Sequence, residues 1–269
     1  MSIDLETIVV DGLTRKLGWV KPATPEKANM RALKTSLRTL RANNGLSPTI
    51  PREQWLEADF ITPFDDPRFI LDQRSSGGCT GWAGAGAMMR QRAMRGFDYK
   101  RLSGACTYAQ INGGRDDGSN IIDCMRALTE KGTCLESEMD FPRIYASQIP
   151  SDATWFKMDE HVTLSDFDDY ATALQMGMLP EFPLNAGGLR QFNGEGVARF
   201  VRGGSNHAVY AARLKRLMDG QWVLGMVNSW AYTWGPFRKG WCWITEDHVD
   251  YSINDDDSFA IAAPRSQAA

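Results

Sequence analysis

The sequence predicts an α+β fold in which helices come first and an antiparallel sheet follows. Helical patterns lie between residues 79 and 175, and strand patterns lie between residues 208 and 262. Strands and helices do not alternate, so a parallel sheet is not expected. The chain has 269 residues, of which 43% are apolar and 23% charged. These values are typical of a globular protein with a sizeable core.

Three segments after residue 50 carry helical patterns. The stretch from Cys79 to Gly96 is rich in alanine and methionine, with several glycines in its first turns. A second helix is expected over 121–131, closed by Gly132 in the conformation that favours glycine at a helix end. A third is expected over 165–175, with Ser165 as its N-terminal cap.

The last third of the chain changes to strand patterns. Residues 208–212 and 221–227 are apolar runs joined by Asp219-Gly220, a pair typical of hairpin turns. Two further strands are expected over 241–245 and 259–262. The order of these runs favours hairpin-connected antiparallel strands.

Residues 1–50 differ from residues 51–269 and form an N-terminal arm or a pro-segment-like extension. Between residues 25 and 45, leucines recur at helical spacing among lysines and arginines, which predicts a basic amphipathic helix. Three interpretations stay open for it. It is a solvated helix packed on the main domain, an arm that docks a partner, or a segment that covers a cleft.

Composition excludes several classes of function. The formal net charge of −3 creates no field that would recruit nucleic acid. No apolar run is long enough to span a membrane, and the first ten residues lack the pattern of a signal peptide. We therefore expect a cytoplasmic protein, or one packaged into a virus particle from a cytoplasm. The five cysteines include no C-x-x-C pair, so no metal site is expected.

Cys79 is the candidate nucleophile. It follows Gly77-Gly78 and opens the first predicted helix. Unpaired backbone N–H groups and the helix dipole at such a position favour the thiolate, which is the reactive form. The glycines, Gly78 among them, let a substrate carbonyl approach the backbone. Gln73 lies on the preceding loop, where its amide can donate to a developing oxyanion together with the Cys79 N–H.

His207 is the candidate base among three histidines. It stands at the mouth of an apolar strand, whereas His161 lies in a predicted surface strand and His248 in a predicted acidic turn. Asn228 ends the strand that pairs with the His207 strand, so it can orient the imidazole. Trp230 can then cover that hydrogen bond and exclude water.

These motifs resemble those of papain-like cysteine peptidases, and their style is closest to bacterial and phage members. The resemblance rests on Asp72-Gln73-x5-Cys79, on His207-Ala208-Val209 and on Asn228-Ser229-Trp230 followed by Trp234-Gly235. His207 and Asn228 lie 128 and 149 positions after Cys79, the spacing typical of that family. The similarity runs from about residue 51 to 261.

The resemblance implies a two-lobe fold with a peptide cleft between the lobes. The helical lobe covers about 51–155 and the β lobe about 156–269. It also implies a Cys-His-Asn triad with a glutamine oxyanion donor, peptide or protein substrates, and no cofactor. Asp117 and Gly118 fall in the loop that contacts the substrate backbone in that family. Two positions depart from the family: Ser76 stands where the family has a cysteine, and Thr80 replaces the aromatic residue that follows the nucleophile.

Two alternatives stay open at this point. The same fold can serve as a structural or binding module of a phage particle or another assembly, with weak or lost catalysis. The same triad can also perform amide transfer or deamidation. The motif residues do not separate hydrolysis from these acyl transfers.

Overall fold

The computed structural model describes residues 5–22, 36–253 and 257–262. Within these ranges, seven α-helices and β-strands precede residue 150, and the remaining strands of the main sheet follow it. The bounds are β1 Thr7–Val10, β2 Leu13–Lys16, α2 Leu37–Asn43, β3 Ala58–Asp59, α3 Cys79–Met94, α4 Gly104–Ala109, α5 Ile121–Glu130, β4 Glu160–Thr163, α6 Phe167–Gln175, β5 Leu179–Leu184, β6 His207–Arg216, β7 Trp222–Val227, β8 Trp241–Thr245, α7 Glu246–Ile253 and β9 Phe259–Ala262.

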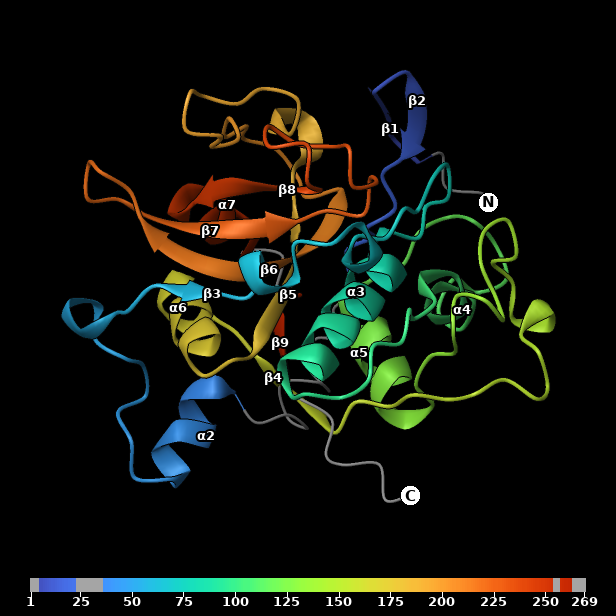
Figure 1. Ribbon diagram of the computed structural model, residues 1–269, viewed down its shortest axis with the longest axis horizontal. Coiled ribbons are helices and arrows are strands. Elements are labelled where there is room, and N and C mark those ends of the chain that lie inside the picture. Colours follow the sequence, from blue (N-terminus) through green and yellow to red (C-terminus); the bar gives the residue numbers. More distant parts are fainter. Residues whose placement is uncertain (1–4, 23–35, 254–256, 263–269) are drawn as a thin grey trace.

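A seven-stranded sheet forms one side of the molecule. Its strands follow the order β4-β9-β5-β6-β7-β8, and β3 pairs with β6. Every pairing is antiparallel. The helices α3, α4 and α5 lie together on the other side (Figure 1). The predicted α+β fold is therefore confirmed.

Helix α3 is the central element of the helical side and is buried on nearly all of its faces. Its glycines allow neighbours to approach closely. A Cβ atom on Gly84 would lie 2.5 Å from Cys124 Sγ of α5, and one on Gly81 would lie 2.7 Å from the Tyr108 nitrogen of α4. The helix also packs on β6. This packing holds the N-terminal end of α3 beside the start of β6.

The predicted elements correspond closely to the observed ones, with two corrections. Strands β8 and β9 have the predicted bounds, and β6 extends beyond the predicted 208–212. Helix α6 is capped by Asp166, whose side chain accepts from the Asp169 N–H, so the prediction of Ser165 as cap was wrong. His248 lies in α7 and is buried rather than in an acidic turn. Its Nδ1 accepts from the Thr245 N–H at the start of that helix.

The N-terminal arm contains a hairpin that the sequence analysis did not anticipate. Strands β1 and β2 pair antiparallel around Asp11 and Gly12, which have φ angles of 50° and 76°. Two positive φ angles are typical of the tightest two-residue hairpin turn. Of the predicted basic helix over 25–45, α2 is present, and residues 23–35 lie outside the described part. In Figure 1 the hairpin stands beside the N-terminal end of α3.

Candidate active site

Cys79 is the first residue of α3, as the sequence predicts, and Gly78 is its N-cap. The lack of a side chain at Gly78 has a structural reason, because a Cβ there would lie 2.4 Å from the Trp82 ring. Cys79 itself is fully buried. All five cysteines are unpaired and buried, so burial alone does not distinguish Cys79 from the rest.

His207 is held by Asn228. Its Nε2 lies 2.8 Å from Asn228 Oδ1, and the same oxygen accepts from the Ser229 N–H at 2.8 Å. Because an amide oxygen can only accept hydrogen bonds, the His207 nitrogen that faces it, Nε2, must carry the imidazole hydrogen. His207 Nδ1 is buried with no hydrogen-bond partner in the described structure. The neutral ring therefore keeps a free basic nitrogen.

The ring of Trp230 covers this hydrogen bond. The centroids of the His207 and Trp230 rings are 4.7 Å apart, and the ring planes meet at 31°. Trp230 is fully buried. An apolar cover excludes water from the Nε2–Oδ1 bond and so strengthens it.

The Cys79 sulfur lies beside the peptide that joins His207 to Ala208. Burial raises the pKa of the Cys79 thiol to about 12, while hydrogen bonds from the Ala208, Gly18 and Thr80 backbones oppose that increase. Burial also lowers the pKa of His207 to about 4, against the opposing effect of the Asn228 bond. Both groups are therefore neutral near pH 7 in this structure. The sequence analysis had expected a thiolate.

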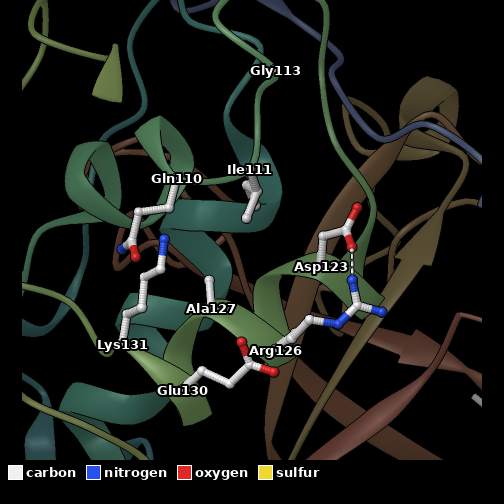
Figure 2. A pocket seen from close by; sticks show the side chains of 8 residues that line it. All are labelled: Gln110, Ile111, Gly113, Asp123, Arg126, Ala127, Glu130 and Lys131. Atoms are coloured by element: carbon white, nitrogen blue, oxygen red, sulfur yellow. Dashed lines mark hydrogen bonds and ion pairs between the residues drawn. The ribbon is translucent and has the colours of Figure 1, made fainter. Parts of the chain in front are cut away.

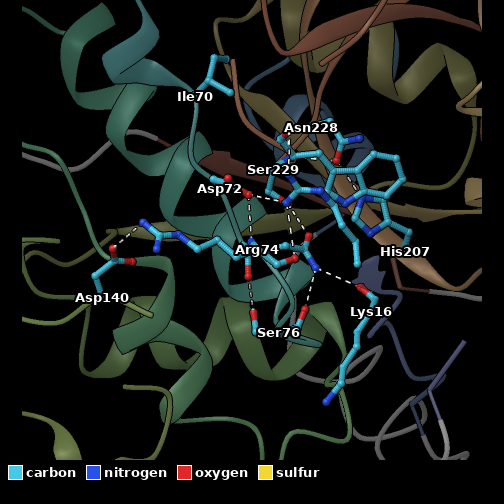
Figure 3. Close-up of polar contacts among 12 residues, drawn as sticks. Lys16, Ile70, Asp72, Arg74, Ser76, Asp140, His207, Asn228 and Ser229 are labelled. Carbon is cyan, nitrogen blue, oxygen red and sulfur yellow. Dashed lines mark hydrogen bonds and ion pairs between the residues drawn. The ribbon is translucent and has the colours of Figure 1, made fainter. Parts of the chain in front are cut away.

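Gln73 lies on the loop before α3 and is fully buried. Ser229 Oγ donates to Gln73 Oε1 at 2.7 Å, which turns the amide nitrogen away from Ser229. That nitrogen donates to the Ser76 carbonyl at 2.9 Å and to the Lys16 carbonyl at 3.1 Å (Figure 3). The predicted oxyanion donor is thus bonded to a carbonyl of the N-terminal arm.

Residues 5–20, here called the covering segment, run across all of these groups. The Gly18 backbone lies close enough to the Cys79 sulfur to lower the pKa of this thiol, against the larger effect of burial. The Ser119 N–H donates to the Gly18 carbonyl at 2.8 Å, and the Val20 N–H donates to the Ser119 carbonyl at 2.9 Å. On the other side, the Trp19 N–H donates to the Asn206 carbonyl at 3.2 Å. The segment is therefore bonded to both halves of the fold.

Two ion pairs fix the covering segment at its strand β2. The buried Arg15 guanidinium bonds to Asp72, the residue before Gln73. Lys16 Nζ donates to Asp116 Oδ2 at 2.6 Å. Asp116 also accepts from the Gly77 N–H at 2.7 Å, two residues before Cys79. The segment is thus attached to both loops that border Cys79.

The four residues predicted to contact substrate have different surroundings. Gly118 touches the covering segment, because a Cβ there would lie 2.2 Å from the Gly18 carbonyl oxygen. Asp117 pairs with Arg115 at 3.3 Å. Gly78 makes room for Trp82, as described above, and Trp230 lies over His207. These four residues stay predictions as substrate contacts.

Sequence reasoning missed the residues of the covering segment. It also missed Asp257, whose carboxylate accepts a hydrogen bond from the Trp19 indole of that segment at 2.7 Å. The Asp11-Gly12 turn was the available signal. It stands between an apolar run and Leu13, the same pattern that identified the Asp219-Gly220 hairpin. No local pattern indicates that the residues after this hairpin lie on Cys79.

A separate hollow of about 300 Å³ lies along α5. It is bordered by α4-end residues such as Gln110 and by charged residues of α5, including an ion pair between Asp123 and Arg126 (Figure 2). None of the predicted catalytic residues lines it. Its mixture of opposite charges selects no particular ligand.

Within the described ranges, His, Cys, Asp and Glu side chains form no group of three that could hold a metal ion. In the same part of the chain, no helix has both the length and the apolarity required to cross a membrane.

The fold matches that of papain-like cysteine proteases. Xylellain, a cysteine protease from Xylella fastidiosa, is 19% identical with a TM-score of 0.64, over 92% of this chain and 96% of that one. A procathepsin B from Trypanosoma congolense is 16% identical with a TM-score of 0.62, over 80% of each chain. Bromelain from Ananas comosus, in complex with the E64 inhibitor, is 15% identical with a TM-score of 0.59, over 80% of this chain and 100% of that one. No family model and no curated protein sequence matches the chain.

Proposed function

We propose that the protein is a cysteine-type peptide hydrolase in which Cys79 is the nucleophile and His207 the base. One observation carries the proposal. The His207 ring is bonded through Nε2 to Asn228, and the peptide that follows it lies at the Cys79 sulfur. A nucleophile, a base and a group that orients the base are the parts that acyl transfer requires.

The proposed reaction begins with proton transfer from the Cys79 thiol to His207 Nδ1. The thiolate attacks the peptide carbonyl carbon, and the Gln73 amide and the Cys79 N–H stabilise the oxyanion. The His207 imidazolium then protonates the leaving amine, and a thioester remains on Cys79. Water attacks the thioester while His207 accepts a proton from it, and the acid leaves. The His207 imidazolium then returns that proton to the Cys79 sulfur, which restores the thiol and the neutral ring.

We also propose that the covering segment keeps the site latent. The Lys16 carbonyl accepts from Gln73 Nε2, the bond that the reaction would use for the oxyanion. The segment excludes water from Cys79 and His207, and burial favours their neutral forms. Displacement of the segment would return water and the oxyanion donor to the site.

The other predictions about the arm and its surroundings stay proposals. Arg38 of α2 bonds to Asp166 and Asp169 of the main domain, and docking of a partner by this helix stays a proposal. Lys27, Arg31 and Lys34 lie outside the described residues. A cytoplasmic location and the similarity to phage members are also proposed on the sequence patterns alone.

Peptide hydrolysis by the 269-residue chain tests the proposed function. The covering segment is loosened by Gly18→Ala, and a mixed peptide library is incubated with this variant. We expect cleavage products by mass spectrometry, and their loss in Gly18→Ala/Cys79→Ser and Gly18→Ala/His207→Ala. Gly18→Ala/Cys242→Ala removes a buried thiol of β8 instead and should retain cleavage. A folded Gly18→Ala chain that cleaves no peptide would favour the structural-module alternative.

A further inference from the structure

Two glycines connect the loop of Gln73 to Cys79. Gly77 and Gly78 carry no side chain that would restrict their backbone angles. The proposed reaction uses the Cys79 N–H to stabilise the oxyanion, so the peptide before it must keep one direction. The Ser76 N–H donates to the Gln73 carbonyl at 3.1 Å, which holds the loop at its first end. Contacts from other elements are needed to hold the two glycines.

A carboxylate from the opposite loop holds the first of these glycines. Asp116 lies between α4 and α5, and its Oδ1 accepts from the Gly77 N–H at 2.7 Å. The Tyr108 hydroxyl donates to the same oxygen at 3.0 Å and so fixes its direction. That hydroxyl also accepts from the Gly118 N–H at 3.1 Å. Asp116 therefore joins the loop before Cys79 to its own loop through a bonded network.

Tyr108 extends this network to the first turn of α3. The residue is fully buried. A Cβ on Gly78 would lie 2.8 Å from Tyr108 Cδ1, so the ring packs directly on the N-cap of the helix. A Cβ on Gly81 would lie 2.7 Å from the Tyr108 nitrogen. A buried network whose members are bonded and packed keeps its groups in one arrangement. The direction of the Cys79 peptide is therefore set from outside its own loop.

The two oxygens of Asp116 have different partners. Oδ1 bonds to Gly77 and Tyr108, whereas Oδ2 accepts from Lys16 Nζ of the covering segment at 2.6 Å. Displacement of the segment removes the partner of Oδ2 and leaves both bonds of Oδ1 in place. The contact with Gly77 is thus available in the open site.

We propose that Asp116 is a positioning residue of the reaction, which acts through the Gly77 N–H to direct the Cys79 N–H at the oxyanion. The inference rests on the proposed function of the site. An oxyanion donor is effective only when it is already directed at the position where charge develops. Misplacement of such a group by about 1 Å reduces the rate about 100-fold. The acceptor oxygen of Asp116, rather than its charge, is the feature required.

The kinetic test uses two open parents, Gly18→Ala and Trp19→Ala, because only the second places no new atom against Gly77. In each parent, Asp116→Ala removes the acceptor, and Asp116→Asn keeps an acceptor oxygen without the charge. Tyr108→Phe keeps the ring and removes the hydroxyl that orients Asp116. Steady-state kinetics on one cleaved peptide and thermal unfolding are measured for every variant.

Glu138→Ala is the matched control for the loss of a carboxylate that holds a loop. Its oxygens accept from the backbone N–H groups of Leu135 and Thr154, both at 3.0 Å. None of these three residues belongs to the proposed catalytic groups. Glu138→Ala should lower thermal stability and leave kcat within a few-fold of its parent.

We expect Asp116→Ala to lower kcat about 10- to 100-fold while KM changes little, because the lost interaction acts in the transition state. Asp116→Asn should recover most of kcat, and Tyr108→Phe should lower it less than Asp116→Ala does. An unchanged kcat in Asp116→Ala, or an equal loss in Asp116→Asn, would overturn the inference. A loss of kcat in Glu138→Ala as large as in Asp116→Ala would overturn it as well.

A measurement without hydrolysis separates this inference from the proposed function. The peptide aldehyde acetyl-leucyl-leucyl-norleucinal adds to the Cys79 thiol: a sulfur–carbon bond forms, and the thiol proton moves to the aldehyde oxygen. That oxygen takes the place of the oxyanion, whereas alkylation by iodoacetamide creates none. Asp116→Ala should therefore weaken aldehyde binding at least about 10-fold and change the alkylation rate little.

The outcomes of the aldehyde measurement are distinct. Equal affinities in Asp116→Ala and its parent, including no binding by either, would overturn the inference. If no peptide is hydrolysed but aldehyde affinity falls in Asp116→Ala and recovers in Asp116→Asn, the proposed function fails and the role of Asp116 stands.

Discussion

Replacing Gly18 by alanine is expected to accelerate alkylation of Cys79 by at least about 10³-fold near neutral pH. The new Cβ would lie 1.7 Å from the Gly77 carbonyl oxygen, a contact that requires backbone to move. Departure of the covering segment returns water to Cys79. Burial holds the pKa of this thiol at about 12 instead of its ordinary 9.0, so its relief increases the thiolate fraction about a thousandfold. The rate is measured with iodoacetamide and peptide mapping.

Two further variants separate displacement from other effects of the substitution. Leu13→Ala changes a residue that is 55% exposed on the same hairpin and should leave the alkylation rate unchanged. Trp19→Ala removes the indole that bonds to Asp257 and places no new atom against Gly77. Trp19→Ala should therefore also accelerate alkylation of Cys79. If neither Gly18→Ala nor Trp19→Ala changes the rate, the covering segment does not control access to Cys79.

Replacing Gln73 by alanine in the Gly18→Ala chain is expected to lower kcat for peptide hydrolysis by about 10²- to 10³-fold. The amide nitrogen of Gln73 is directed by Ser229 toward the Lys16 carbonyl, which occupies the place proposed for the oxyanion. The interaction forms in the transition state, so kcat should fall while KM changes little. Steady-state kinetics on one cleaved peptide provide both constants.

Gln110→Ala is the matched control for this substitution. Its amide nitrogen bonds to the Cys106 and Gly132 carbonyls, away from the predicted catalytic residues. We expect kcat in this variant to stay within a few-fold of the parent, with any loss appearing in thermal stability. A rise in KM without a change in kcat for Gln73→Ala would exclude Gln73 as the oxyanion donor.

Much of the fold could be predicted because its elements are coded locally. Helix α3 begins at Cys79, as expected from the change to alanine- and methionine-rich sequence after Gly77-Gly78. The β6–β7 hairpin follows from Asp219-Gly220 between two apolar runs, and Gly220 has the positive φ of 89° that such a turn requires. His207 and Asn228 are brought together by that pairing, and the structure places their polar atoms 2.8 Å apart.

The covering segment was beyond local patterns, because contacts with distant residues hold it. The Lys16 carbonyl meets Gln73, and the Trp19 indole meets Asp257, which is 238 positions further along the chain. Nothing near Asp257 in the sequence indicates that its carboxylate bonds to the covering segment. The pairing of β9 with β4 and β5 brings Asp257 to the start of α5.

The charge state of the site was also unpredictable from local rules. A cysteine at a helix N-terminus is expected to be a thiolate, and the backbone N–H groups around Cys79 do act in that direction. Burial under the covering segment has the larger effect and reverses the outcome. The sequence thus predicted the chemistry of an open site, whereas the structure is that of a covered one.

The pH dependence of Cys79 alkylation tests the central claim most directly. In the unaltered chain, the rate should rise about tenfold per pH unit between about pH 6 and 9, because the thiol pKa of about 12 lies above that range. In Gly18→Ala, His207 regains water and its pKa rises from about 4 toward its ordinary 6.5, so a thiolate–imidazolium pair can form. The account predicts a fast, nearly flat profile in mildly acidic solution, which His207→Ala abolishes. Parallel profiles for the two chains, both without an acidic plateau, would contradict it.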